Sequence, residues 1–151
     1  MNDAQYKVDW DAFHVHCARL CDKIHQSGCT FTKILAVTRG GAVPAGIIAY
    51  QLGIKHIETI SLETYGGEGE RQVGDVKLLK APRVDYLADT LIIDDLVDTG
   101  TTFAYLKPRT KNCLFVSVFA KPKGAPFTDL YEKDIPQDEW VVFPWDERPE
   151  I

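Results

Sequence analysis

One stretch decides the fold of this 151-residue chain: LIIDDLVDTGTT, residues 91–102. Three apolar residues run into two adjacent acids, Asp94 and Asp95, and a third acid, Asp98, precedes a turn of small residues. An uninterrupted apolar run is typical of a strand buried on both faces of a parallel sheet. The carboxyl end of such a strand lies at the rim where open α/β sheets bind ligands. We therefore expect these acids at a ligand-binding edge.

The turn Thr99–Thr102 is expected to lead into a short helix over 103–106 and to form a cup for a phosphate group. Small side chains leave backbone N–H groups accessible, and a turn that opens a helix points them outward. Neighbouring carboxylates repel a phosphate unless the ligand also brings hydroxyl groups or Mg²⁺ for the acids. A phosphorylated ribose offers this combination.

Two other interpretations fit part of the stretch. Asp98-Thr99-Gly100 is also the triplet of aspartic proteases, but those are all-β, whereas this chain alternates strands and helices. A plain strand end with a capping Asp would explain the triplet alone. The full twelve-residue string favours phosphoribosyl binding over both.

Composition indicates an ordinary globular protein, with 45% hydrophobic and 26% charged residues, and the length fits one domain over residues 1–151. A net charge of -5 argues against nucleic-acid binding. Polar residues interrupt any N-terminal signal, and the uncharged stretch 40–54 is too short to span a bilayer. We therefore expect a cytoplasmic protein without a transmembrane segment.

Apolar periodicity predicts alternating strands and helices, hence an α/β fold with a mostly parallel sheet covered on both faces. Asp9 should cap a helix that ends at Ser27-Gly28. A second helix is expected over 45–52, and 63–75 should be a long loop of the functional or disordered kind. Strands are expected over 33–38, 56–62, 76–79, from residue 91, over 113–120 and over 140–143.

The first predicted helix carries an apolar stripe of Trp10, Phe13, Cys17, Leu20, Cys21 and Ile24. His14 and His25 share a face with its two cysteines, but at 1.5 Å rise per residue the outer pair would lie roughly 16 Å apart. The four side chains therefore cannot bind one ion. Buried thiols are the preferred interpretation, and a two-residue metal site at Cys17 and Cys21 stays open.

Polar and aromatic residues follow other predicted strands. Thr38-Arg39-Gly40-Gly41 should reach the same edge as the acid pair, where its glycines permit close approach and Arg39 offers donors to phosphate. Taken alone, this loop is a plain strand-to-helix turn. Lys121 alone would be a surface lysine, and Trp140 alone a core residue.

Four segments resemble the bacterial xanthine-guanine phosphoribosyltransferases, members of the type I purine phosphoribosyltransferase family: VTRGGAVPAG (37–46), LIIDDLVDTGTT (91–102), VFAKPKG (118–124) and DIPQDEWVVFPWD (134–146). The resemblance implies the type I phosphoribosyltransferase fold with a small C-terminal hood. It implies purine salvage, in which phosphoribose moves from 5-phosphoribosyl 1-diphosphate (PRPP) to N9 of guanine, xanthine or, less well, hypoxanthine. A homotetramer and peripheral association with the inner membrane are implied as well.

The resemblance also implies site residues. For PRPP these are Thr38, Arg39, Gly40, Arg71, Asp94, Asp95, Leu96, Val97, Asp98, Thr99, Gly100, Thr101 and Thr102. The acid pair would hold the ribose hydroxyls, with Asp95 also on a Mg²⁺ ion. Residues 98–102 would hold the 5′-phosphate, and residues 38–40 the diphosphate.

For the purine, the resemblance implies that Lys121 donates to the 6-oxygen, Trp140 stacks on the ring, and the Val141 carbonyl accepts from the 2-position. Asp98 would take the N7 proton, which makes Asp98, Asp94 and Asp95 the catalytic acids. The chain departs from the family where Thr38 replaces the usual Ser, between Arg71 and Lys77, and in its C-terminal tail. An alternative is a non-catalytic PRPP sensor of the same fold.

Overall fold

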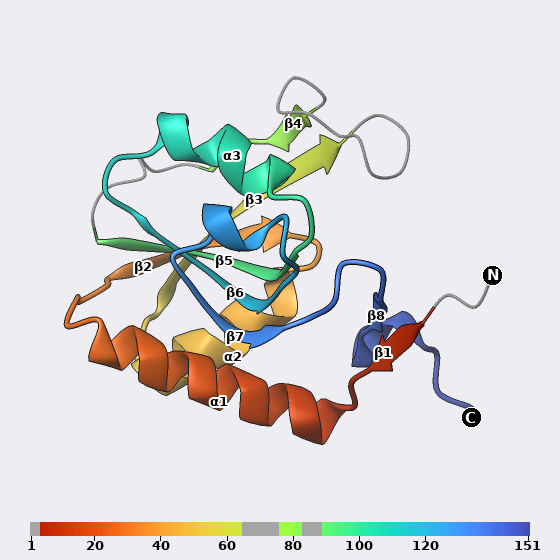
Figure 1. Ribbon diagram of the computed structural model, residues 1–151. Helices are drawn as coiled ribbons and strands as arrows, with labels where there is room; N and C mark the ends of the chain where they lie inside the picture. The colour runs from red at the N-terminus through yellow and green to blue at the C-terminus, as the bar shows by residue number, and fades with distance from the viewer. Residues whose placement is uncertain (1–3, 65–75, 83–88) are drawn as a thin grey trace.

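The computed structural model describes residues 4–64, 76–82 and 89–151, and its centre is a six-stranded sheet (Figure 1). The strand order is β4-β3-β2-β5-β6-β7, and every neighbouring pair is parallel except β3 and β4. The strands are β2 (Lys33–Thr38), β3 (His56–Thr64), β4 (Val76–Lys80), β5 (Thr90–Val97), β6 (Leu114–Ala120) and β7 (Leu130–Asp134). This confirms the expected mostly parallel sheet.

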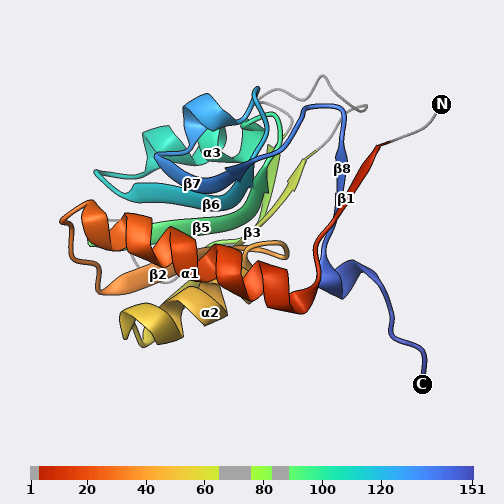
Figure 2. The ribbon, with the colours of Figure 1, turned by 60° about the horizontal axis from the view of Figure 1, so that its bottom comes forward.

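Helices cover both faces of the sheet. The helices α1 (Trp10–Gln26) and α2 (Ala42–Leu52) lie on one face, and α3 (Thr101–Leu106) lies on the other (Figures 1 and 2). Short 3₁₀ helices follow at η2 (Lys107–Arg109), η3 (Ala125–Phe127) and η4 (Pro144–Asp146). Within the described residues, no helix is both long enough and apolar enough to cross a membrane.

The apolar run that opens β5 is buried on both faces, as its sequence predicts. Leu91 and Ile93 pack into the core beneath α1 and α2, whereas Ile92 packs on the other side, against α3. Alternate residues of a strand point to opposite faces, so a strand between two helical layers needs apolar residues at every position. The uninterrupted apolar run therefore indicates that β5 is an inner strand covered on both faces.

Several predicted boundaries were wrong. β5 begins at Thr90, one residue before the expected start, and it continues past the acids to Val97, because Leu96 and Val97 still pair with β6. α3 begins at Thr101 rather than at residue 103, and α2 begins at Ala42 rather than at residue 45. Both helices begin directly after a glycine, Gly100 or Gly41, that ends the preceding turn.

The apolar stripe of α1 was predicted correctly except at its first residue. Asp9 caps the helix by accepting the Ala12 N–H at 2.8 Å, and the stripe from Phe13 to Ile24 is buried. Trp10, however, is 54% exposed, because it is the first residue of the helix. Its ring contacts the Trp145 ring in a tilted arrangement, with ring centroids 6.0 Å apart.

A small two-stranded sheet stands apart from the main one and forms the hood (Figure 2). The strands β1 (Gln5–Lys7) and β8 (Trp140–Val142) pair in parallel, with Tyr6 opposite Val141. Val141 and Phe143 are buried, but Trp140 remains 64% exposed. The interpretation of Trp140 as a core residue is therefore excluded.

Candidate active site

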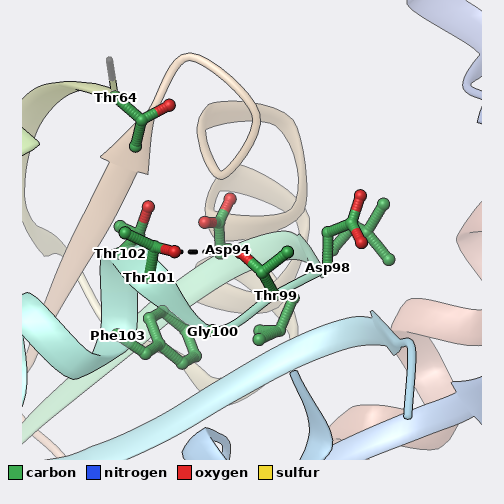
Figure 3. Close-up of a pocket in the computed structure, with 10 residues that line it drawn as sticks. Thr64, Asp94, Asp98, Thr99, Gly100, Thr101, Thr102 and Phe103 are labelled. Atoms are coloured by element: carbon green, nitrogen blue, oxygen red, sulfur yellow. Dashed lines mark hydrogen bonds between the residues drawn. The ribbon is translucent and has the colours of Figure 1, made fainter. Parts of the chain in front are cut away.

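The carboxyl edge of the sheet holds a pocket of about 180 Å³ beside the turn after β5 (Figure 3). Asp94, Leu96 and Val97 of β5 line it, together with the turn residues Asp98, Thr99 and Gly100, the helix residues Thr101, Thr102 and Phe103, and Thr64 of β3. The pocket lies at the turn where the sequence predicts a phosphate cup, and phosphate binding there stays a prediction. Its lining combines hydroxyl groups, backbone at the start of a helix, and carboxylates.

The turn owes its shape to Gly100, which has a φ of 85°. A Cβ atom there would lie 2.1 Å from the Phe127 ring, so both the backbone conformation and the packing require glycine. The Thr99 and Thr101 hydroxyl groups lie 2.9 Å apart across the turn (Figure 3). Small hydroxyl side chains therefore face the pocket where a phosphate would have to fit.

A larger pocket of about 670 Å³ lies beside the first. It is lined by Arg39, Gly40, Val43, Asp95, Leu96, Asp98, Trp140, Val141, Phe143, Trp145 and Asp146. The loop after β2 and the hood strand β8 thus meet the acids of β5 around one cavity. Asp98 lines both pockets, and so does Leu96.

Glycines bring the loop after β2, which contains a cis peptide bond between Thr38 and Arg39, onto the acid pair. A Cβ on Gly40 would lie 2.5 Å from Asp95 Oδ1, and one on Gly41 would lie 2.4 Å from the Ile93 carbonyl oxygen. No other residue allows this approach. The Gly40 backbone is thereby held next to the Asp95 carboxylate.

The acid pair is electrostatically strained in the absence of a ligand. Burial, and then the charge of Asp95, raise the pKa of Asp94 well above its usual range. Burial likewise raises the pKa of Asp95, and the charge of Asp146 across the larger pocket adds to the effect. Each carboxylate still accepts one backbone hydrogen bond, from Asp95 N–H at 2.8 Å and Leu96 N–H at 2.7 Å. A cation or a ligand hydroxyl would relieve this repulsion.

The acid pair fits a magnesium ion. Mg²⁺ binds proteins through one or two carboxylates and keeps waters and ligand oxygens for its other positions. In the described part of the chain, no group of three or more His, Cys, Asp or Glu residues is arranged to hold a metal by itself. The donor set therefore suits an ion that arrives with an oxygen-rich ligand.

Asp98 is held by two side chains. Lys121 Nζ lies 3.4 Å from Asp98 Oδ2, and the Lys121 side chain is only 5% exposed, which excludes its interpretation as a surface lysine. Gln137 Nε2 donates to Asp98 Oδ1 at 2.7 Å. A buried ammonium group needs a charged or polar partner, and Asp98 supplies one at the boundary between the pockets.

Most of the predicted site residues line these two pockets, but two of the described ones do not. Lys121 lines neither pocket, and its ammonium group contacts their shared residue Asp98. The Thr38 hydroxyl points along the sheet, 2.8 Å from Ser61 Oγ and 3.2 Å from the Ile60 carbonyl oxygen, and Thr38 lines neither pocket. Arg71 and most of the predicted loop 63–75 lie outside the described residues.

Asp146 and Gln137 are among the site residues that were missed from the sequence. Asp146 lines the larger pocket, and Gln137 contacts Asp98. Both belong to the quoted segment DIPQDEWVVFPWD, so the signal was present without an assigned role.

The cysteine pair on α1 lies in the core, away from both pockets. Burial raises the pKa of Cys17 to about 12 and that of Cys21 to about 11. Such thiols stay protonated at neutral pH, which favours the interpretation as packing residues.

Comparison with known proteins agrees with this geometry. The model of the phosphoribosyl transferase domain matches residues 8–150. The chain belongs to the phosphoribosyltransferase family. The carboxyl edge of its sheet is accordingly the candidate active site of a phosphoribosyltransferase.

Solved structures share the fold of this phosphoribosyltransferase. A purine phosphoribosyltransferase from Pyrococcus horikoshii is 24% identical with a TM-score of 0.77, and the match covers 97% of each chain. The Helicobacter pylori xanthine-guanine-hypoxanthine phosphoribosyltransferase is 21% identical with a TM-score of 0.76 over 94% of each chain. A mutant of the Trypanosoma cruzi hypoxanthine phosphoribosyltransferase, complexed with the product IMP, is 20% identical with a TM-score of 0.70, over 90% of this chain and 80% of that one.

Proposed function

We propose that this phosphoribosyltransferase acts in purine salvage and transfers 5-phosphoribose from PRPP to N9 of a 6-oxopurine, with release of diphosphate. The observation that carries the proposal is the shared lining of the two pockets. Asp98 faces a small hydroxyl-lined pocket on one side and a larger aromatic-edged pocket on the other. A ligand with a phosphate at one end and a flat ring at the other would fill both.

PRPP is proposed to bind across the carboxyl edge. The turn Asp98–Thr102 would hold the 5′-phosphate, and the Thr38–Gly40 backbone with Arg39 would hold the diphosphate. Asp94 and Asp95 would accept the ribose hydroxyl groups, because Asp94 lines the small pocket and Asp95 the large one. Mg²⁺ at Asp95 would neutralise charge on the leaving diphosphate.

The base is proposed to enter the larger pocket. Trp140 would stack on the purine ring, the Lys121 ammonium would donate to its 6-oxygen, and the Val141 carbonyl would accept from the 2-position. As the bond to diphosphate breaks, C1′ gains positive charge, which the nearby carboxylates stabilise. Asp98 would accept the N7 proton while N9 attacks C1′.

The substrate assignment is tested by turnover with Mg²⁺, PRPP and one base at a time. Adenine presents an amino donor where a 6-oxopurine presents an acceptor, so Lys121 would face another donor. An unpaired buried donor costs about 1–3 kcal/mol, and a charged donor such as the Lys121 ammonium costs more, which predicts at least a tenfold loss for adenine. We expect guanine and xanthine to react best, then hypoxanthine. Guanine can donate its 2-amino group to the Val141 carbonyl and xanthine can donate an N–H group, whereas hypoxanthine offers fewer donors there.

The Lys121→Gln variant sharpens this test. An amide can both donate and accept, so the variant should lose much of its discrimination between oxo and amino bases. Wild-type protein that turned over adenine as readily as guanine would exclude the base assignment. Absence of turnover with every 6-oxopurine, despite PRPP binding, would favour the alternative function as a PRPP sensor.

Assembly and location are proposed from the same resemblance. We propose a homotetramer of single-domain subunits in the cytoplasm. Light scattering at micromolar concentration tests the assembly, and a monomeric mass would exclude it.

A further inference from the structure

We propose that Gln137 is a positioning residue for phosphoribosyl transfer, and that its side-chain amide holds the Asp98 carboxylate between the two pockets. This inference rests on the proposed function, in which Asp98 takes a proton from the base. Gln137 was assigned no role from the sequence. Its side-chain contacts join three segments: the turn after β5, the turn after β6 and the segment that leads into β8.

The orientation of the Gln137 amide is fixed by its surroundings. The Lys123 backbone N–H donates to Gln137 Oε1 at 2.9 Å, and only the oxygen end of an amide can accept that bond. The nitrogen end must therefore face Asp98. It does so at 2.7 Å from Oδ1, and it lies 3.4 Å from the Asp98 carbonyl oxygen.

Asp98 needs such a partner because little else restrains it. Its side chain is 51% exposed, and the Lys121 ammonium on Oδ2 lies at 3.4 Å, which is long for a charge-assisted bond. Gln137 occupies the other oxygen. The two side chains thus hold opposite oxygens of one carboxylate and set the direction in which its remaining lone pairs point.

Loss of the Gln137 amide would change both of these groups. A carboxylate released at Oδ1 can turn toward the ammonium and form a closer ion pair with it. That pair would take the Lys121 donors away from the purine oxygen and turn Asp98 away from N7. Gln137 therefore keeps Lys121 and Asp98 available for the base at the same time.

The position of Gln137 in the chain connects this contact to the hood. It lies in the turn where Glu139 N–H donates to the Pro136 carbonyl at 3.1 Å, three residues before Trp140. The strand that carries the stacking residue is thereby tied to the residue that would take the proton. Correct docking of the hood and correct alignment of Asp98 depend on the same amide.

The test uses Gln137→Met, which keeps the length of the side chain and removes the amide. Gln51→Met, on an exposed position of α2, is the matched control. With PRPP and guanine, we expect kcat of the Gln137 variant to fall about tenfold, because hydrogen bonds to charged groups are worth more than neutral ones. KM for PRPP should stay within about twofold and Tm within about 2 °C of wild type.

A double-mutant cycle separates positioning from a merely structural role. If Gln137 acts through the Asp98 carboxylate, then adding Gln137→Met to an Asp98→Asn enzyme should change kcat less than about twofold. A tenfold loss in both backgrounds, or a wild-type kcat in the single variant, would overturn the proposal.

Crystal structures of wild type and Gln137→Met give a readout that does not need turnover. We expect the Asp98 carboxylate of the variant to rotate toward Lys121 Nζ. An unmoved carboxylate would refute the positioning role even if the wild type proved inactive. Inactivity of the wild type with every base would refute only the proposed function.

Discussion

At the scale of single residues, the candidate site contains charged groups that do not stabilise the fold. Asp94 and Asp95 are adjacent, half-buried and close to Asp146, so their charges repel in the empty protein. Active sites often keep destabilising groups of this kind, because function can require them. The acid pair should therefore be visible in the pH dependence of unfolding.

We expect Asp94→Asn to raise the stability of the ligand-free protein at neutral pH. The pKa of Asp94 is higher in the folded protein than in the unfolded chain, where it is about 3.9. The folded state thus binds more protons as the pH rises above about 4, and stability falls through that window. The variant lacks this loss, and its Oδ1 can still accept the Asp95 N–H.

Chemical unfolding of both proteins between about pH 4 and pH 8 measures the difference. It should be small at the acid end and should grow toward the alkaline end in favour of the variant. A variant that unfolds more easily than wild type at the alkaline end would contradict the electrostatic interpretation.

At the scale of elements, neighbouring glycines have different tasks. A Cβ on Gly41 would meet backbone oxygens of Ile93 and Val37 at 2.4 and 2.7 Å, whereas a Cβ on Gly40 would meet the Asp95 carboxylate. Gly41→Ala should therefore lower the free energy of unfolding by about 1–3 kcal/mol, as overpacking does. Gly40→Ala should cost less stability and more activity.

Gly46 is the matched control for the glycine substitutions. It lies within α2, and a Cβ there meets no atom within 4 Å. Gly46→Ala should stabilise the protein by about 0.5–1 kcal/mol, because alanine restricts the unfolded chain. Equal unfolding curves for the Gly41 and Gly46 variants would show that the close contacts at Gly41 do not matter.

The hood is attached to the main sheet through a polar chain of contacts. Glu132 on β7 pairs with His16 Nδ1 on α1, and His16 Nε2 lies 3.5 Å from the Tyr6 hydroxyl on β1. Tyr6 is the register partner of Val141 on β8. Arg19 also lies 3.9 Å from Glu132, but His16 has Glu132 as its carboxylate partner. Since both His16 and Glu132 are largely buried, the removal of Glu132 leaves the His16 Nδ1 atom without that partner.

Glu132→Ala should lower the free energy of unfolding by about 3 kcal/mol, the scale for breaking a buried pair. The surviving enzyme should show a raised KM for the base and a nearly unchanged KM for PRPP, because the loosened hood carries Trp140 and Val141. Unfolding curves and steady-state kinetics measure both effects, with the exposed Glu150→Ala as control. An equal rise in both KM values would speak against a local effect on the hood.

The sequence predicts elements with strong local patterns and misses those that depend on distant partners. The apolar run of β5 and the stripe of α1 carry their burial in their own residues. β1 is a short strand, and its partner β8 lies at the other end of the chain, so no local sequence pattern predicts that the two strands pair. The contact of Gln137 with Asp98 is hidden for the same reason, because it joins residues 39 positions apart.

At the scale of the whole molecule, the site is a meeting point of segments from most of the chain. β2 contributes the Arg39 loop, β5 the acids, β6 leads to Lys121, and the hood supplies Trp140 and Val141. The shared carboxyl edge of parallel strands explains why the first three could be placed together from sequence. A ligand that contacts all of them should stabilise the entire fold.

We expect Mg²⁺ with PRPP to raise Tm strongly. A ligand that binds only the folded state at about one hundred times its Kd adds about 2.7 kcal/mol. For a domain of this size each kcal/mol shifts Tm by about 2–4 °C, so the rise should be about 5–11 °C. PRPP with a chelator should give a smaller rise, because the acid pair then faces the phosphates without a cation.

The Asp95→Asn variant tests whether the rise in Tm depends on the Asp95 carboxylate or comes only from phosphate binding elsewhere in the site. The variant removes a charge that is repelled in the empty site, so its ligand-free Tm should equal or exceed that of wild type. It also removes the proposed magnesium ligand and an acceptor for ribose hydroxyl groups, so most of the rise with Mg²⁺ and PRPP should disappear. Thermal melts of both proteins, with and without Mg²⁺, PRPP and chelator, measure this. A full rise in the variant would place the cation elsewhere and remove Asp95 from the PRPP site.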